Sequence, residues 1–350
     1  RALAKALGVD GIEAAETLPA DQVAWIEAVA RDLRKHAGAS LVVAGDEQPA
    51  VVHALTHSVN RALENVGRTV VYTDPVEVRP VDEGASLREL VADMQAGKVE
   101  TLLILGGNPV YTAPVDLKFS DALNKVLFRA HLGLYDDETS TLCHWHIPEA
   151  HYLEAWSDLR AYDGTVSIQQ PLIAPLWGGR SAHEILSAVL GEPGKASYDI
   201  VRDFWRAQGR AADFDLFWRK ALHDGVVPDT TLPARAPAWK PTLTGPSARP
   251  TDPGHLEIVF RPDPTVWDGR FANNGWLQEL PKPLTKLTWD NAVLLGPATA
   301  ARLDLQTDDV VELTHAGQSV RGPVWIMPGH PEDSVTVHFG YGRTKAGRAG

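Results

Sequence analysis

Two glycines and an asparagine that follow an apolar run are the clearest candidates for ligand chemistry. The run Leu102–Leu105 leads directly into Gly106, Gly107 and Asn108. A continuous apolar run that ends at glycine predicts a strand buried on both faces, and the glycines allow a close approach by a ligand. Ligands of open α/β sheets bind at the carboxyl ends of strands, so the turn is predicted to face a cofactor. An ordinary strand-to-loop turn explains the same pattern, because a single glycine pair is a weak signal.

One cysteine and three histidines lie near each other in the sequence: Cys143, His144, His146 and His151. Zinc sites commonly use ligand pairs with regular spacing, and this Cys-His-x-His run fits such spacing poorly. We therefore predict no metal site, and polar lining of a cleft for these side chains. A single cysteine also excludes an internal disulfide and an iron–sulfur cluster bound by the chain's own cysteines, which needs about four.

The elements that must position the turn alternate between strand and helix patterns. Helical spacing of apolar residues predicts helices over 20–37 and 51–63, and apolar or β-branched runs predict strands at 41–44 and 69–73. A further helix precedes the strand at 102–105, and another strand is expected near 126–132. This order implies parallel pairing, so we predict an α/β fold with a Rossmann-like layered parallel sheet.

The last third of the chain changes to short strands separated by turn residues. Such strands are predicted at 256–260, 293–295, 309–314, 319–327 and 334–339, and their spacing suggests a small barrel. Proline resists both helix and central strand, so the proline-rich segment before them is predicted to be a linker. The expected domains are an α/β domain at 1–230, a linker at 231–254 and a β-barrel at 255–350.

Composition limits the classes of partner. The chain has 350 residues, 44% of them hydrophobic and 22% charged, which is ordinary for a globular protein. Its net charge of −12 argues against a nucleic-acid partner. No apolar run approaches the ~18–20 residues of a membrane span, so we predict a soluble chain without a transmembrane segment. We interpret the acids Glu257, Asp263 and Asp268 as surface charges. Because the sequence begins at Arg1, we also expect it to be a piece of a longer protein.

Several motifs occur together in one order. They are GGNP after a strand, DDET, IPEAHYLEAW, DGTVSIQQPLIAPL, then NNGWLQELPKPLTKLTWDNA, LGPATAARLDLQTDDVVEL and GYGR. This series resembles the molybdopterin oxidoreductases that bind a bis-guanine-dinucleotide cofactor. Within them it is most similar to the molybdopterin-like iron–sulfur subunit of alternative complex III, a membrane-associated quinol:cytochrome c oxidoreductase. The resemblance covers roughly residues 40–350 and implies Rossmann-like layers followed by a double-psi type barrel.

The resemblance also implies a set of residues that line a cofactor cleft. Glycine amides can bind phosphate oxygens, and asparagine can pair with a guanine or pterin edge. The implied cofactor-binding residues are Gly106, Gly107, Asn108, Thr112, Glu138, Thr139, His151, Glu154, Asn274, Trp276, Trp289 and Asn291. For Glu154, a capping or buried hydrogen-bond role is as well supported as proton transfer. No catalytic residue is assigned, because the family's cluster cysteines and metal ligand lie upstream of the matched region.

Two functions follow from the resemblance. In the first, the chain is part of a redox subunit whose walls hold molybdopterin guanine dinucleotide, within a respiratory complex that contains cytochrome and iron–sulfur subunits. In the second, it is a scaffold that has lost the cofactor and positions those partners. Iron–sulfur clusters are expected only outside this chain, and the isolated chain is expected to be inactive and free of cofactor. The resemblance implies a place on the periplasmic side of the bacterial cytoplasmic membrane, peripheral to it. A free-standing dehydrogenase is disfavoured, since residues 41–47 lack a G-x-G-x-x-G fingerprint.

Overall fold

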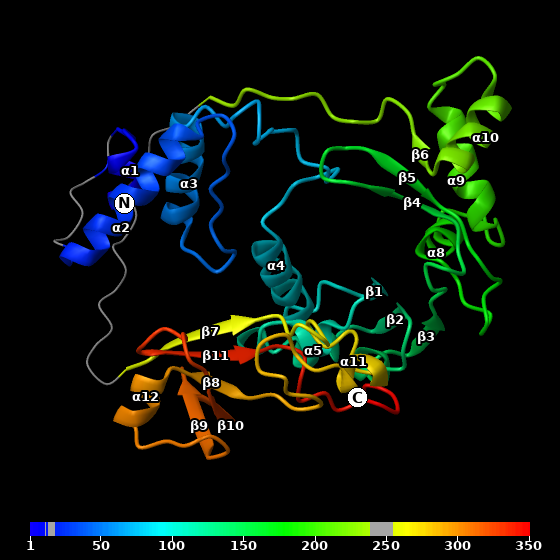
Figure 1. Cartoon of the computed structure of the whole chain (residues 1–350). Helices are drawn as coiled ribbons and strands as arrows, with labels where there is room; N and C mark the ends of the chain where they lie inside the picture. Colours follow the sequence, from blue (N-terminus) through cyan, green and yellow to red (C-terminus); the bar gives the residue numbers. More distant parts are fainter. Residues whose placement is uncertain (11, 13–17, 239–254) are drawn as a thin grey trace. The chain divides into compact units, whose positions relative to one another are not determined.

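A computed structural model describes residues 1–10, 12, 18–238 and 255–350 (Figure 1). The chain divides into two compact units. The first contains Arg1–Val78, Arg160–Thr165 and Asp229–Pro250, and the second contains Arg79–Leu159, Val166–Pro228 and Thr251–Gly350. Most of the linker predicted at 231–254 lies outside the described residues, and the predicted domain boundaries remain a prediction. Among the described helices, none combines the length and the apolarity that crossing a membrane requires.

The first unit is helical. Helices α1 (Ala2–Ala6), α2 (Ala20–Lys35) and α3 (Ala50–Ala62) bury a small apolar core that includes Ala30, Leu55 and Val59. The helices predicted at 20–37 and 51–63 are confirmed.

The strand predicted at 41–44 is wrong. Leu41 and Val43 are 55% and 75% exposed, so their apolar side chains face water rather than a sheet. The Asn60 side chain accepts a hydrogen bond from Val42 N at 3.0 Å and donates to Val42 O at 2.7 Å. It therefore satisfies the backbone groups that a neighbouring strand would bind. Residues 69–73 also form no strand: they make only isolated bridges, Val66 with Val70 and Tyr72 with Arg235.

The second unit contains a three-stranded parallel sheet in the order β1-β2-β3. Its strands are β1 (Thr101–Leu105), β2 (Phe128–Gly133) and β3 (Trp145–Pro148). Helices α4 (Glu83–Gln95) and α6 (Phe119–Leu123) contribute Met94 and Leu123 to a core that β1 also packs against. Short helical segments α5 (Pro109–Thr112), η1 (Val115–Leu117) and α7 (Glu138–Thr141) follow the first two strands. The predicted strand at 102–105 and its glycine turn are confirmed. Its predicted burial on both faces is wrong, because Leu105 is 37% exposed and the side chains before it are only partly buried.

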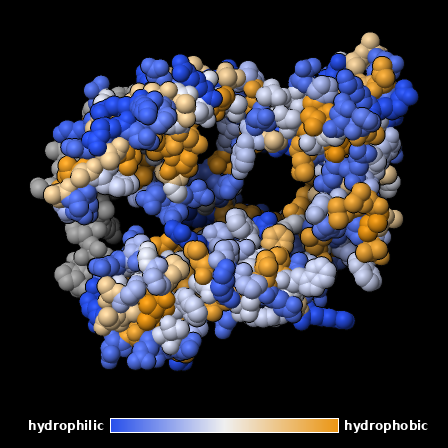
Figure 2. All heavy atoms as spheres, in the orientation of Figure 1, coloured by the Kyte–Doolittle hydropathy of each residue, from blue (hydrophilic) through white to orange (hydrophobic). Residues whose placement is uncertain are grey.

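A helical layer with a small sheet follows, and all of it except Arg160 at the end of β4 belongs to the same unit. Strands β4 (Ser157–Arg160), β5 (Val166–Gln169) and β6 (Val226–Val227) form a sheet, and helices α8 (Ala182–Val189), α9 (Ser197–Ala207) and α10 (Phe214–Asp224) come between β5 and β6. Trp205 and Trp218 are central to its core. Large apolar side chains nevertheless remain exposed here, including Leu172, Trp177 and Leu190, and Figure 2 shows hydrophobic surface in this region.

The last part of the second unit is a mixed five-stranded sheet in the order β7-β11-β8-β10-β9. Its strands are β7 (Glu257–Arg261), β8 (Val293–Leu295), β9 (Val310–His315), β10 (Gln318–Ile326) and β11 (Ser334–His338), with helices α11 (Gly275–Glu279) and α12 (Pro297–Arg302). The predicted strand pattern is confirmed. The sheet curls around Val293, Leu295, Val324 and Val335 as a half-barrel (Figure 1).

Candidate functional site at the glycine turn

The glycine turn lies at the carboxyl end of β1, where a strand of a parallel sheet presents its ligand-facing loop. Gly106 and Gly107 both have left-handed backbone, with φ of +71° and +74°, which other residues adopt only with strain. Gly106 N donates to Leu132 O at 2.8 Å, and the buried His131 ring donates from Nε2 to Gly107 O at 3.0 Å. The turn is thus fixed by β2, independently of any ligand.

Two consecutive amides of the turn remain available. In the described part of the chain, neither Gly107 N nor Asn108 N has a hydrogen-bond acceptor. Gly107 is exposed, and a Cβ added to it would meet no atom within 4 Å. Neighbouring N–H groups that point into open space can bind an anion such as phosphate. The main chain of this turn therefore fits a phosphate-bearing ligand.

The side chains beside the turn are already bonded to one another. Asn108 Nδ2 donates to Glu138 Oε2 at 2.7 Å, and Asn108 Oδ1 accepts from the Thr139 hydroxyl at 2.7 Å and from Thr139 N at 3.2 Å. The Thr139 side chain is fully buried and also accepts a hydrogen bond from Val110 N at 3.1 Å. Thr112 closes the helical turn by donating to Asn108 O at 3.0 Å. Both acceptor sites of Asn108 Oδ1 and one of the two Nδ2 hydrogens are therefore used within the protein, which leaves at most one N–H for a base.

Arg343 completes this group from near the end of the chain. Its Nε and Nη2 donate to the Glu138 carboxylate at 3.0 and 2.8 Å, and its Nη1 donates to Gly269 O at 2.7 Å. Both side chains are about one-tenth exposed, at 10% and 9%. The amides of Thr344 and Lys345 donate to Glu138 Oε1 at 2.8 and 3.0 Å. We call Asn108, Glu138, Thr139 and Arg343 the interlock.

The electrostatics of the interlock favour the charged form of Glu138. Burial alone would raise the pKa of this carboxyl. Arg343, Asn108 and the Lys345 amide outweigh burial, and together they hold the pKa of Glu138 far below its usual range. The Arg343 guanidinium also lies 4.8 Å from the centre of the Tyr111 ring, whose hydroxyl donates to Tyr341 O at 2.7 Å. The interlock therefore joins the sheet edge to the C-terminal segment.

A second buried polar group lies within the half-barrel part. Asp263 is 1% exposed, so its interpretation as a surface charge is wrong. Its Oδ1 accepts from Thr265 N at 2.8 Å and from Val266 N at 3.0 Å. Its Oδ2 accepts from the Tyr341 hydroxyl at 3.1 Å and lies 3.7 Å from Lys282 Nζ. Burial and the nearby Asp263 charge raise the pKa of Tyr341, so this phenol stays protonated and donates its hydrogen.

The predicted residues from the half-barrel part make local contacts. Asn274 caps α11 by accepting from Leu277 N at 3.2 Å, and Asn291 Nδ2 donates to His338 O at 2.9 Å. Trp276 is 86% exposed, and Trp289 has a left-handed backbone with φ of +65°. The structure describes no hydrogen bond between these four residues and the glycine turn. Their role toward a cofactor remains a prediction.

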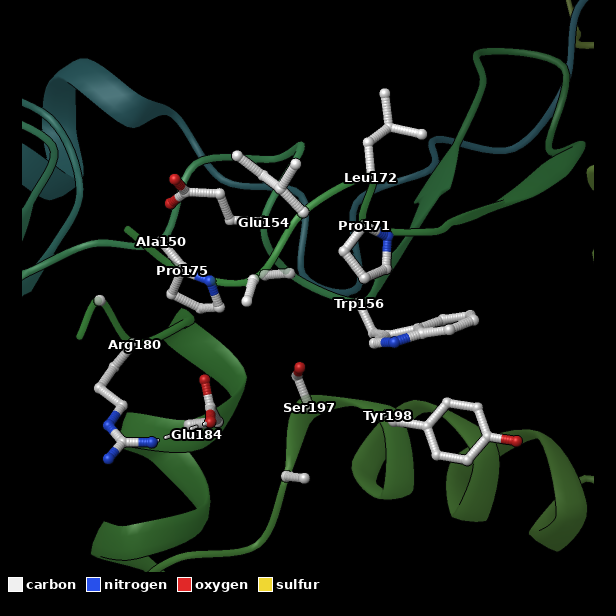
Figure 3. A pocket seen from close by; sticks show the side chains of 15 residues that line it. Ala150, Glu154, Trp156, Pro171, Leu172, Pro175, Arg180, Glu184, Ser197 and Tyr198 are labelled. Carbon is white, nitrogen blue, oxygen red and sulfur yellow. Dashed lines mark hydrogen bonds and ion pairs between the residues drawn. The ribbon is translucent and has the colours of Figure 1, made fainter. Parts of the chain in front are cut away.

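His151 and Glu154 belong to a different feature. The Glu154 carboxylate accepts from His151 N at 3.1 Å and from Leu176 N at 3.3 Å, which fixes the loop around it. Glu154 lines a pocket of about 580 Å³ together with Trp156, Arg180 and Tyr198. Figure 3 shows Glu154 and the loop at Pro171 and Leu172 on one side of the pocket, and Ser197 and Tyr198 on the other. The glycine turn does not line this pocket.

The resemblance implies a molybdopterin dinucleotide. The backbone amides of the glycine turn fit such a ligand, but the neighbouring side chains do not. The free amides of Gly107 and Asn108 suit its phosphates. The Asn108 amide, which should contact a base, already uses Oδ1 and one Nδ2 hydrogen within the interlock, so it keeps only one N–H for a base. The Glu149 carboxylate lies 3.8 Å from the position that a Cβ on Gly106 would take, and it would face any bound anion. In the described residues, no group of three His, Cys, Asp or Glu side chains could hold a metal ion.

Four residues that help to close this site were not predicted from the sequence: Arg343, Tyr111, His131 and Glu149. Two of the quoted motifs contain the signal, because DDET supplies Glu138 and GYGR supplies Arg343. An acid and an arginine at 205 positions' separation become partners only through the fold.

Comparisons with known proteins agree with this architecture. No family model matches the chain. It is similar to the menaquinone reductase molybdopterin-binding-like subunit of Nitratidesulfovibrio vulgaris, with 27% identity over 339 residues, covering 90% of this chain and 46% of that protein. It is also similar to the thiosulfate reductase molybdopterin-containing subunit of Salmonella typhimurium, with 38% identity over 74 residues, covering 21% of this chain and 10% of that protein.

A solved structure shows the same fold. Acetylene hydratase from Pelobacter acetylenicus aligns with a TM-score of 0.55 and 14% sequence identity, covering 75% of this chain and 41% of that structure. The chain spans less than half the length of the curated relatives it matches. In sequence the chain is thus similar to molybdopterin-binding and molybdopterin-binding-like subunits of oxidoreductases, and in fold it is similar to acetylene hydratase.

Proposed function

We propose that this chain is part of a subunit of a membrane-associated respiratory complex of the quinol:cytochrome c oxidoreductase type. In this role it is a structural frame that positions cytochrome and iron–sulfur subunits for electron transfer. Two facts support the proposal: the resemblance of the motif series to molybdopterin oxidoreductases, and the similarity to a protein named as a menaquinone reductase subunit that is molybdopterin-binding-like. We extend the proposal to alternative complex III because of the motifs around His151 and Asn274.

The interlock is the observation that carries the structural role. In a cofactor-binding wall, the side chains that recognise the ligand keep polar atoms free for it. Here the polar atoms of Asn108 and Glu138 form hydrogen bonds with each other, with Thr139 and with Arg343. A buried bidentate arginine–carboxylate pair fixes the relative position of two segments. The site therefore favours a structural role, in which it joins the sheet edge to the C-terminal segment, over recognition of a nucleobase.

A second candidate, a wall that binds molybdopterin guanine dinucleotide, is favoured by one observation. The amides of Gly107 and Asn108 have no acceptor in the described residues, and such a pair suits a phosphate. The poor fit of the neighbouring side chains leaves this candidate behind the first.

Finer features of the fold belong to the same proposal. The half-barrel would close as a double-psi barrel in the complete protein, as a domain at 255–350 after the proline-rich segment 231–254. The motivation is the change from helical to strand patterning together with the prolines. Limited proteolysis followed by mass spectrometry tests it: the first cut should fall between 231 and 254, and a first cut inside either predicted domain contradicts it.

The proposed place in the cell can be tested on native membranes. The full-length parent protein should co-purify in detergent with haem-containing and iron–sulfur subunits that carry electrons from a quinol to cytochrome c. It should also be digested by protease added to intact spheroplasts, because we propose the periplasmic side. Purification without redox subunits contradicts the function, and protection in spheroplasts with digestion in inverted vesicles contradicts only the side of the membrane.

A further inference from the structure

A single acid stands in front of the glycine turn. Glu149 follows β3 directly, so it lies at the same carboxyl edge of the sheet as Gly106 and Gly107. Its backbone is held there, because Glu149 N donates to Gly133 O at 3.0 Å. Its two carboxylate oxygens lie 3.8 and 3.9 Å from the position that a Cβ on Gly106 would take. The carboxylate therefore occupies the space that the glycine leaves open.

The carboxylate of Glu149 has no partner of its own. Within the described part of the chain, no hydrogen bond or ion pair to its side chain is found. The side chain is half-buried, and burial raises its pKa. An acid without donors thus lies beside amides without acceptors. This arrangement differs from a capping contact, in which an acid would bind the free amides directly.

We propose that Glu149 determines which ligands the glycine turn accepts, because its carboxylate repels an anionic group that would otherwise bind the amides of Gly107 and Asn108. A diphosphate bound there shares the space in front of Gly106 with the carboxylate. Like charges close together in a partly desolvated place repel strongly. The inference rests on the proposed function, since it explains why a turn built for phosphate serves in a structural frame.

Guanosine diphosphate is a suitable probe because it carries a guanine base and an anionic diphosphate, as the dinucleotide does, without a metal or a pterin. Binding to the 350-residue chain can be measured by isothermal titration calorimetry for wild type and for Glu149→Gln, which keeps the size of the side chain. We expect Glu149→Gln to bind guanosine diphosphate at least tenfold more tightly than wild type. Equal affinities, or no binding by either protein, would overturn the proposal.

Matched controls separate charge from fold and shape. Glu100→Gln makes the same change of charge one residue before β1. The glycine turn follows the other end of β1, so this variant should leave the affinity unchanged. Neutral guanosine should bind wild type and Glu149→Gln equally. A gain for guanosine as large as that for the diphosphate would show that shape rather than charge is responsible, and would contradict the proposal. If Glu149→Gln melts at a lower temperature than wild type, Glu149→Ala repeats the test with the same expectation.

The outcome is independent of the test of the proposed function. Co-purification with redox subunits can fail while Glu149→Gln still binds the probe, which would leave the inference intact. Equally, both proteins can bind the probe alike while co-purification succeeds, which would remove the inference alone.

Discussion

The interlock and the glycine turn share Asn108 but differ in how their polar groups are satisfied. In the interlock, the buried Glu138 carboxylate accepts hydrogen bonds from Arg343, Asn108 and two backbone amides. At the turn, the Gly107 and Asn108 amides and the Glu149 carboxylate have no partner in the described residues. The buried groups of the interlock have to bind one another, because native structures rarely leave buried polar groups unpaired. Gly107 is exposed and Glu149 is half-buried, so water or a ligand can bind the polar groups of the turn.

The largest expected effect comes from breaking the interlock. Arg343→Met removes the cation and leaves the Glu138 charge buried, which should lower the free energy of unfolding by about 3–5 kcal/mol. Urea unfolding followed by circular dichroism measures it. Arg302→Met is the matched control, because Arg302 pairs with Asp333 at the surface and should cost at most about 1 kcal/mol. Equal losses for the two variants would mean that the interlock contributes no more than a surface ion pair.

Acid should weaken the interlock. The pKa of Glu138 in the folded chain lies below its ordinary value of 4.5, so its contribution is complete above that pH and is lost as the pH falls. The stability gap between wild type and Glu138→Gln should therefore narrow below pH 4.5, by at most about 1.4 kcal/mol per pH unit. Urea unfolding of both proteins from pH 7 to pH 3 measures the gap. A gap that stays constant over this range would show that the carboxylate is not stabilised in the folded state.

A smaller effect is expected at the centre of the interlock. Thr139→Val keeps the shape of the side chain but removes the hydroxyl that binds Asn108 Oδ1 and Val110 N, at a cost of about 1–3 kcal/mol. Thr112→Val removes an exposed hydroxyl whose one partner among residues 1–10, 12, 18–238 and 255–350 is Asn108 O, and it should cost less. Thermal unfolding measures the stability loss of each variant. A larger loss for Thr112→Val than for Thr139→Val would mean that the turn contributes more to stability than the interlock.

The smallest effect should come from the open turn. Gly107→Ala places a Cβ in empty space, so only the left-handed backbone is strained, by about 1–2 kcal/mol. Glycine at a position with ordinary backbone, Gly275, is the control and should tolerate alanine within about 0.5 kcal/mol. A loss for Gly107→Ala as large as that for Arg343→Met would mean that the turn is as integral to the fold as the interlock.

The strands and the turn could be predicted from the sequence where local patterns decide structure. The five short strands after residue 255 follow from alternation and turn residues, and β1 follows from a short apolar run that ends at glycine. The strand prediction at 41–44 failed because the Asn60 side chain, 18 positions away, binds the backbone N–H and C=O of Val42, which a neighbouring strand would otherwise bind. A local pattern cannot show such a substitute.

The candidate site was only half predictable for a similar reason. Asn108, Glu138 and Thr139 were identified through the resemblance, and the structure brings them together. Glu138 pairs with Arg343, which is 205 positions away in the sequence. Buried Asp263 has its partners Lys282 and Tyr341 at distant positions too. In the sequence, Asp263 lies between two prolines and Glu138 follows two aspartates, which is typical of surface loops. Their burial becomes evident only when their distant partners are known.

The central claim is that the interlock has replaced recognition of a cofactor. Its most direct test is the pterin and molybdenum content of the full-length parent protein, purified within its native complex and extracted with acid and oxidant. The account predicts no pterin fluorescence and no stoichiometric molybdenum or tungsten, with iron contributed by regions outside this chain. About one molybdenum or tungsten atom and a pterin dinucleotide per chain would contradict the claim, and would show that the Asn108 amide exchanges its partners for a ligand.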